Sequence, residues 1–181
     1  DASTNPNFKA ADDDVTKIRK EVYTFGHRNP FHVRVDSKSG WVFWGEVGPD
    51  ATSDSNTRGP AGHDEWNVAV RPGFFGHPFC NGYNVPYNEM TKASPATYGA
   101  KFNCLAADNL SPNNTGIKHM PPAVPAVVAY TNGNSSDDDP RFNASATSWS
   151  KPSHEGETAV GGPMYRYSTT STSASRFPAW W

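Results

Sequence analysis

The sequence predicts an all-β protein, and three features of its composition support this class. Leucine and isoleucine are rare, since the 181 residues contain two of each against thirteen valines. A helical bundle needs leucine-rich stripes at helical spacing, which this chain cannot supply. Fifteen glycines and sixteen prolines divide the chain into short segments, and aromatic residues make up 13% of it. We therefore expect short strands, long loops and a core rich in aromatic rings.

The first predicted strands lie in the first quarter of the chain. Residues 1–20 are polar and without periodicity, and residues 21–25 are predicted as the first strand. Residues 31–36 alternate between apolar and polar side chains, which indicates a half-buried strand. Residues 37–40 form a turn, and residues 41–47 return as a more fully buried strand. These last two strands are predicted to form a hairpin.

Three more strands are predicted, at residues 64–70, 123–130 and 162–167. The first of them alternates and places Trp66, Val68 and Val70 on one face. Residues 81–114 carry isolated aromatics and no strand pattern. The later part of the chain is therefore expected to be rich in loops.

Charge and motifs exclude several classes of function. The chain has 16 Lys and Arg against 18 Asp and Glu, a net charge of −2, whereas a nucleic-acid-binding protein normally carries a basic face. No stretch approaches the roughly 18 consecutive apolar residues of a membrane span. The sequence has no nucleophile elbow, no phosphate-binding loop, no dinucleotide fingerprint and no zinc-type histidine spacing. A hydrolase, a kinase and a nicotinamide-dependent enzyme therefore have no support.

The cysteines and four glycosylation sequons favour a secreted (extracellular or periplasmic) protein. Cys80 and Cys104 are either two unrelated buried thiols or a disulfide, which would close a loop of about 25 residues and contribute about 3 kcal/mol. The disulfide is favoured because the surroundings are typical of secreted proteins. The sequons lie at Asn109, Asn113, Asn134 and Asn143. In a chain so rich in Asn, Ser and Thr, roughly two or three such triplets arise by chance.

Two clusters of polar residues are candidates for a site. Arg28 and Asn29 lie in a turn between predicted strands and offer donors to a planar ligand rich in carboxylates and carbonyls. The alternative is a structural turn in which Arg28 pairs with a nearby acid. Residues 46–50 and 64–65 supply carboxylates and loop carbonyls, the hard oxygen ligands of calcium, although a solvated acidic loop is the commoner outcome.

A series of motifs resembles the glucose/sorbosone dehydrogenase family, the soluble quinoprotein sugar dehydrogenases. The best-matching motifs are YTFGHRNPF at 23–31, GWVFWGEVGP at 40–49, GHDEWN at 62–67 and PGFFGHP at 72–78. Later blocks resemble the branch found in larger secreted multidomain proteins; they are SPNNTG at 111–116, PPAVP at 121–125 and GGPMY at 161–165. The resemblance covers about residues 20–181 and is strongest over 21–78.

The resemblance implies a portion of a six-bladed β-propeller with long loops, which carries pyrroloquinoline quinone and calcium and oxidises an aldose sugar. Arg28 and Asn29 fall where the family contacts the quinone. Gly48 and Pro49 fall where main-chain carbonyls ligate the calcium of the cofactor. Glu65 and the carbonyl of Phe75 fall where some members hold a second calcium ion.

The chain is expected to be one partial propeller domain, residues 1–181. It would comprise a polar lead-in at 1–20, the best-matching blade region at 21–78 and a loop-rich remainder at 79–181. Six blades of roughly 40–50 residues need a longer chain, so the expected partners are the remainder of the propeller or other copies, together with the sugar.

Departures from the family leave a second function open. The family's catalytic histidine lies upstream of the Arg-Asn motif, but no histidine precedes His27, so no catalytic residue is assigned and the chain alone is expected to be inactive. His77 replaces the usual tryptophan, and the loop over residues 50–63 is longer than in the compact enzymes. The alternative is a non-catalytic secreted binding or structural module that retains the calcium sites.

Overall fold

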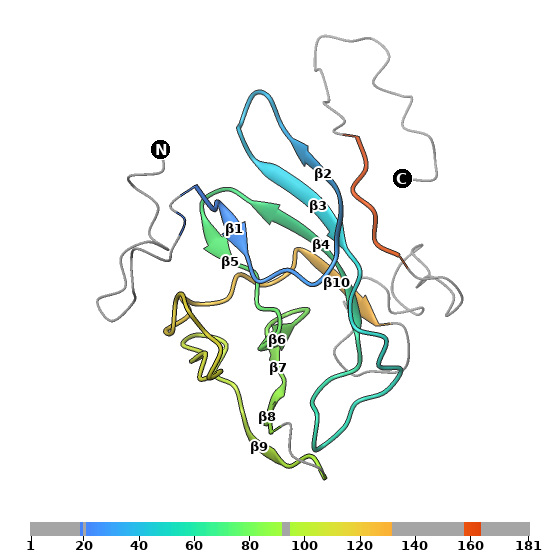
Figure 1. Cartoon of the computed structure of the whole chain (residues 1–181). Coiled ribbons are helices and arrows are strands. Elements are labelled where there is room, and N and C mark those ends of the chain that lie inside the picture. The colour runs from blue at the N-terminus through green and yellow to red at the C-terminus, as the bar shows by residue number, and fades with distance from the viewer. Residues whose placement is uncertain (1–18, 20, 92–94, 132–157, 164–181) are drawn as a thin grey trace.

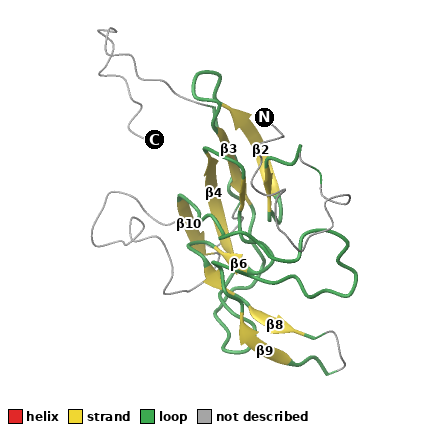
Figure 2. Ribbon diagram, turned by 90° about the vertical axis from the view of Figure 1, so that its left-hand side faces the viewer, coloured by secondary structure: helices red, strands yellow, loops and turns green. Residues whose placement is uncertain are grey.

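The described part of the protein is built of strands, turns and loops (Figures 1 and 2). The computed structural model describes residues 19, 21–91, 95–131 and 158–163, and these contain ten strands and no helix. The predicted all-β class is therefore confirmed for these residues. None of them forms a helix of the length and apolarity that crossing a membrane requires.

The largest sheet has four antiparallel strands, three of them consecutive in the chain and one added from much later. Its strands lie in the order β10-β4-β3-β2, and consecutive members pair in register, for example Val42 with Ala69 and Val128 with Trp66. The strands are β2 (Pro30–Val35), β3 (Val42–Glu46), β4 (His63–Ala69) and β10 (Val128–Thr131). The predicted hairpin is the β2–β3 pair.

Strand β2 differs from the prediction in its burial. Residues 31–36 were expected to form a half-buried strand, but all six residues of β2 are exposed. The strand lies at the edge of the sheet, and a bulge near His32, at φ 53°, interrupts its register with β3. Alternation in the sequence predicts one buried and one exposed face, but both faces of this edge strand are exposed.

The apolar side chains of strand β4 are not its most buried ones. Trp66 and Val68 are only partly buried, and Val70, just beyond the strand, is 54% exposed. The alternate residues Glu65 and Asn67 are buried instead. Because burial of polar groups is costly unless they are paired, this reversed pattern indicates a polar site beneath the sheet.

Six short strands complete the structure. Strands β1 (Thr24–Phe25) and β5 (Gly73–Phe74) pair in parallel, so the predicted strand over 21–25 begins only at Thr24. The other pairs are β6 (Cys80–Asn81) with β7 (Val85–Pro86), and β8 (Asn88–Met90) with β9 (Tyr98–Lys101). These two pairs lie in the region expected to lack strands.

The remaining strand predictions are met only in part. Of the strand expected over residues 123–130, only β10 forms, from Val128 onward. Residues 162 and 163 are not in a strand, and residues 164–167 lie outside the described part.

The core consists of two clusters, and the predicted disulfide lies in the larger one. Cys80 and Cys104 are bonded, with their Cα atoms 6.0 Å apart, which confirms the pairing. Both cysteines pack with other buried residues, which are Phe74, Phe79, Ala107, Met120 and Ala123. Trp44, Ala69 and Phe75 form the second cluster. Both clusters contain aromatic rings, Phe74 and Phe79 in the first and Trp44 and Phe75 in the second, as the composition predicts.

A late segment, residues 158–163, covers the sheet at Gly45. Ala159 N donates to Asp64 Oδ2 at 2.8 Å, and Trp66 Nε1 donates to the carbonyl of Val160 at 3.3 Å. A Cβ atom on Gly45 would lie 2.3 Å from the carbonyl oxygen of Ala159. Glycine is therefore required at this position so that the segment can approach the sheet.

Candidate functional site

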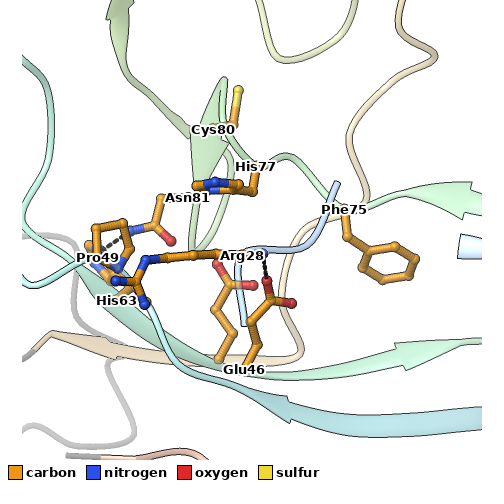
Figure 3. Close-up of a pocket in the computed structure, with 10 residues that line it drawn as sticks. Arg28, Glu46, Pro49, His63, Phe75, His77, Cys80 and Asn81 are labelled. Carbon is orange, nitrogen blue, oxygen red and sulfur yellow. Dashed lines mark hydrogen bonds between the residues drawn. The ribbon is translucent and has the colours of Figure 1, made fainter. Parts of the chain in front are cut away.

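Five segments that are distant in sequence surround one small pocket, called the polar pocket below (Figure 3). It is lined by Arg28, Glu46, Gly48, Pro49, His63, Glu65, Phe75, His77, Cys80 and Asn81. They come from the turn after β1, the end of β3 and its following loop, β4, the turn after β5, and β6. The free volume of the pocket, measured by the positions that the centre of a water-sized sphere can take, is about 10 Å³. This is enough for about one water molecule or one ion.

The structure gathers most of the residues that the family resemblance assigned. Arg28, Gly48, Pro49, Glu65 and Phe75 all line the polar pocket. Phe75 directs its ring away from Arg28 (Figure 3) and packs it against Trp44, with the ring centroids 4.7 Å apart.

Asn29 is the exception among the assigned residues. It is exposed and does not line the pocket. Its main-chain carbonyl instead accepts a hydrogen bond from Val47 N at 3.1 Å, which ties the turn to the end of β3. The structure thus gives Asn29 a structural contact.

Arg28 is held at the rim by its main chain and its side chain. Its backbone N–H donates to Glu46 Oε1, and its Nη1 donates to the carbonyl of Val47 at 3.1 Å. Its Nη2 lies 3.6 Å from Asp50 Oδ1, so the acid pairing that the sequence left open is present. The Arg28 side chain is 31% exposed and that of Asp50 is 90% exposed, so the pair contributes little stability.

Gly48 allows two chain segments to meet at the pocket. A Cβ atom on Gly48 would lie 1.9 Å from the carbonyl oxygen of His63, so no larger residue fits. The Gly48 N–H donates to Asp64 Oδ1 at 2.9 Å. Asp64, fully buried, also accepts from Ala159 N and from the Tyr130 hydroxyl. It therefore joins three parts of the chain behind the pocket.

Glu46 is a buried carboxylate with several donors. Arg28 N donates to Oε1, while Oε2 accepts from His27 Nδ1 at 3.2 Å and from Trp44 Nε1 at 3.0 Å. Burial alone raises the pKa of this carboxyl. The hydrogen bonds outweigh burial and leave the pKa of Glu46 below its usual value. Glu46 is therefore ionised at neutral pH.

Glu65 lies beside Glu46 on the neighbouring strand, and its pKa is shifted in the opposite direction. Asn67 Nδ2 donates to Oε2 at 2.9 Å, and Gly82 N donates to Oε1 at 2.6 Å. Burial, together with the charges of Glu46 and Asp64, outweighs these bonds and raises the pKa of Glu65 to about 7. At neutral pH its carboxyl is therefore about half protonated.

The acidic cluster is buried, so the interpretation as a solvated acidic loop is wrong for its main members. Glu46 is 4% exposed, Glu65 is 6% exposed and Asp64 is fully buried. Two of these acids, Glu46 and Glu65, line the pocket, and Arg28 is the one Lys or Arg among the described residues that line it. Such an arrangement favours a bound cation, since a cation lowers the repulsion between the carboxylates.

Sequence reasoning missed the histidines and the asparagine of the pocket. His63 Nδ1 lies 3.0 Å from the carbonyl of Ala61 and 3.3 Å from Asn81 Nδ2. Burial lowers the pKa of His77, with Arg28 and His27 acting in the same direction and Glu46 against them. The signal that could have found part of this set is the alternation of His63, Glu65 and Asn67 along β4.

The size and chemistry of the pocket suit a single hard cation. Among the described residues, no three His, Cys, Asp or Glu side chains are arranged to hold a metal ion. The resemblance assigns Gly48 and Pro49 to one calcium ion and Glu65 with Phe75 to a second, but the pocket has space for one ion only. A single calcium ion there would depend on the Glu65 carboxylate together with main-chain carbonyls, for which Gly48 and Pro49 are the candidates. The interior of the pocket has no room for a tricyclic quinone and fits a cation only, whereas the partly exposed Arg28 side chain at the rim remains available to a quinone that lies outside it.

The four sequons divide into described and undescribed sites. Asn113 is exposed, and Asn109 is partly buried, with its Oδ1 accepting from Ser111 N at 3.2 Å. Asn134 and Asn143 lie outside the described residues.

Comparison with known proteins finds no match, since no family model, no curated protein and no solved structure is similar to the chain at a significant level.

Proposed function

We propose that the chain is part of a secreted protein of the glucose/sorbosone dehydrogenase type, a calcium-binding β-propeller oxidoreductase that uses pyrroloquinoline quinone to oxidise an aldose. One observation carries this proposal. Five of the six residues that the motifs assign to cofactor and calcium line the same pocket, although they span residues 28 to 75 of the sequence. A chance set of motif matches has no reason to converge in space.

The buried acids support calcium as the occupant of the polar pocket. Glu46 is held ionised by its donors, and burial, with the charges of Glu46 and Asp64, raises the pKa of Glu65, so a cation beside Glu65 would favour its ionised form. Calcium takes carboxylate and carbonyl oxygens and tolerates irregular geometry, which suits Glu65 with Gly48 and Pro49. When bound in such sites, a metal ion polarises a carbonyl oxygen as a Lewis acid.

The pocket size favours a second candidate, a non-catalytic module that keeps calcium and has lost the redox chemistry. The polar pocket holds about one ion and does not enclose a quinone. Arg28 at its rim is the side chain through which the two candidates differ. In the enzyme it contacts the quinone, and in the module it only closes the turn against Val47 and Asp50.

Thermal unfolding with added metal tests the calcium site. Calcium at about 100-fold above its dissociation constant should raise Tm by roughly 5 °C or more at pH 8, and magnesium should not match it. Glu65→Gln should lose most of the shift, because it removes the only charged ligand of the proposed set. No calcium-specific shift in the wild-type chain would overturn both candidates.

Quinone binding then separates the two candidates. With calcium present, the enzyme candidate predicts quenching of tryptophan fluorescence by pyrroloquinoline quinone, and Arg28→Ala should weaken it markedly. Arg34→Ala is the matched control, since Arg34 lies on the exposed strand β2 and its Nη1 donates only to the carbonyl of Val33. Calcium binding without any quinone binding supports the non-catalytic module and contradicts the enzyme.

A further inference from the structure

Asp64 is a buried acid that joins the polar pocket to a distant part of the chain. It is fully buried and does not line the pocket, although its sequence neighbour Glu65 and its hydrogen-bond partner Gly48 both do. Its Oδ1 accepts from Gly48 N at 2.9 Å, and its Oδ2 accepts from Ala159 N at 2.8 Å and from the Tyr130 hydroxyl at 3.4 Å. One carboxylate group is therefore shared between the pocket and a segment that lies 95 residues further along the chain.

On the pocket side, the carboxylate of Asp64 fixes the main chain at Gly48. Glycine has the greatest conformational freedom of any residue, and the hydrogen bond from Gly48 N to Asp64 removes part of it. The chain at this point also lies so close to His63 that no Cβ atom would fit beside the His63 carbonyl group. The carbonyls of Gly48 and Pro49, the candidate ligands of calcium, follow directly after this N–H group. Their positions therefore depend on the orientation of the Asp64 carboxylate.

On the other side, residues 158–163 cover the sheet with little buried surface. Of these six residues, only Ala159 is buried. Besides the hydrogen bond from Ala159 N to Asp64, Gly161 N donates to the carbonyl of Phe31 at 3.1 Å. Segments with few buried contacts open locally at a smaller free-energy cost than the core of a fold does. A hydrogen bond to a carboxylate is stronger than one between neutral groups, so Asp64 is a main anchor of this segment.

The two main-chain contacts of Asp64 support each other. If residues 158–163 leave the sheet, Oδ2 loses Ala159 N and keeps, among the described residues, only the longer hydrogen bond from the Tyr130 hydroxyl. A buried carboxylate that has lost a donor is destabilised, and it reorients toward water or another donor. Such a reorientation releases Gly48 N. Conversely, a cation that binds the carbonyls after this N–H group holds the loop in place and keeps Asp64 oriented toward Ala159.

We propose that Asp64 is a positioning residue through which the docking of residues 158–163 strengthens cation binding in the polar pocket. By thermodynamic linkage, the cation strengthens the docking by the same factor. The cation half of the proposal rests on the proposed function, because it takes calcium as the occupant of the pocket. The pocket therefore reaches its full calcium affinity only in a chain whose 158–163 segment is docked.

Two adjacent glycines provide the test and its control. A Cβ atom on Gly161 would overlap the carbonyl oxygen of His32, so Gly161→Ala should displace the segment. Neither Gly161 nor His32 lines the polar pocket. Gly162→Ala is the matched control, since no atom beyond its chain neighbours lies within 4 Å of a Cβ atom there. In calorimetric titration of the full chain with calcium, Gly161→Ala should bind about fivefold or more weakly than wild type, and Gly162→Ala should bind like wild type.

A double-mutant cycle shows whether Asp64 carries the effect. Asp64→Asn keeps the shape of the side chain, but its amide nitrogen must face one of the two main-chain donors, so one of those hydrogen bonds is lost. In this background Gly161→Ala should weaken calcium binding little further, because the coupling is already broken. An equal loss of affinity in both backgrounds would mean that the segment acts by another route, and it would overturn the role of Asp64.

Amide hydrogen exchange of the wild-type chain measures the reverse effect. Saturating calcium should slow the exchange of the amides in residues 158–163 by about the same factor, relative to the chain in EDTA. The coupling alone is overturned if the wild type binds calcium but this exchange is unchanged, or if Gly161→Ala and Gly162→Ala bind calcium equally. A wild-type chain that binds no calcium would overturn the proposed function together with the coupling.

Discussion

Replacing Glu65 with glutamine should remove a pH dependence that this buried carboxyl imposes on stability. Burial raises the pKa of Glu65 from 4.5 to about 7 in the folded state. The folded state therefore holds the proton more tightly than the unfolded state does. The stability associated with Glu65 is fully present below pH 4.5 and is lost as the pH rises through 7. One pKa unit corresponds to roughly 1.4 kcal/mol, so the loss is about 3 kcal/mol.

Glutamine is a suitable replacement because neighbouring groups can form hydrogen bonds with both its amide nitrogen and its amide oxygen. The Oδ1 atom of Asn67 is buried and has no hydrogen-bond partner, while its Nδ2 donates to Glu65. If the side-chain amide of Asn67 rotates by half a turn, its oxygen can accept a hydrogen bond from the amide nitrogen of the glutamine introduced at residue 65. The oxygen of that side chain still accepts from Gly82 N. The variant thus keeps the hydrogen bonds and loses only the titrating group.

Urea unfolding followed by tryptophan fluorescence, in EDTA at pH 4.5 and pH 8, measures the effect. The free energy of unfolding of Glu65→Gln should rise relative to wild type by about 3 kcal/mol between the two pH values. Glu89→Gln removes an exposed carboxyl and should show no such change. Parallel pH profiles for wild type and Glu65→Gln would refute the assignment of the buried charge.

Two further predictions concern the scaffold. Replacing Cys80 and Cys104 together with serine should lower the free energy of unfolding by about 3 kcal/mol, the value for a loop of this length, and should leave the wild type and the variant equal in stability under reducing conditions. Gly45→Ala should destabilise the sheet measurably in a thermal melt, because the new Cβ atom would lie 2.3 Å from the Ala159 carbonyl oxygen. Gly162→Ala, where no atom lies within 4 Å, should melt like wild type, and equal Tm values for both variants would contradict the close approach.

The parts of the fold that the sequence predicts are the ones with enough residues to show a period. Strand β4 has seven residues and lies where alternation places it, and strand β3 has five residues and lies where the sequence predicts a more fully buried strand. Strands such as β5, β6 and β7 have two residues each, too few for any periodic signal. They form because neighbouring segments bring their main chains together, which is a property of the tertiary structure.

The candidate site was predictable through motifs and much less through local chemistry. Alternation placed Trp66 and Val68 on one face of β4, but both are only partly buried, whereas Glu65 and Asn67 on the other face are buried. No local rule indicates that Glu65 and Asn67 will be paired in the interior. That outcome depends on Gly82 and on other chain segments, which arrive from distant parts of the sequence.

Residues 158–163 are the last described part of the chain to be synthesised. Ala159, which donates to Asp64 across the sheet, follows it by 95 residues. Translation adds roughly 5–20 residues per second, so β4 is synthesised on the order of 5–20 s before residues 158–163, which cover the sheet. During that interval the nascent sheet lacks the main-chain donor of Ala159. We therefore expect nascent chains that lack this segment to interact with chaperones and to be cut by proteases within the sheet.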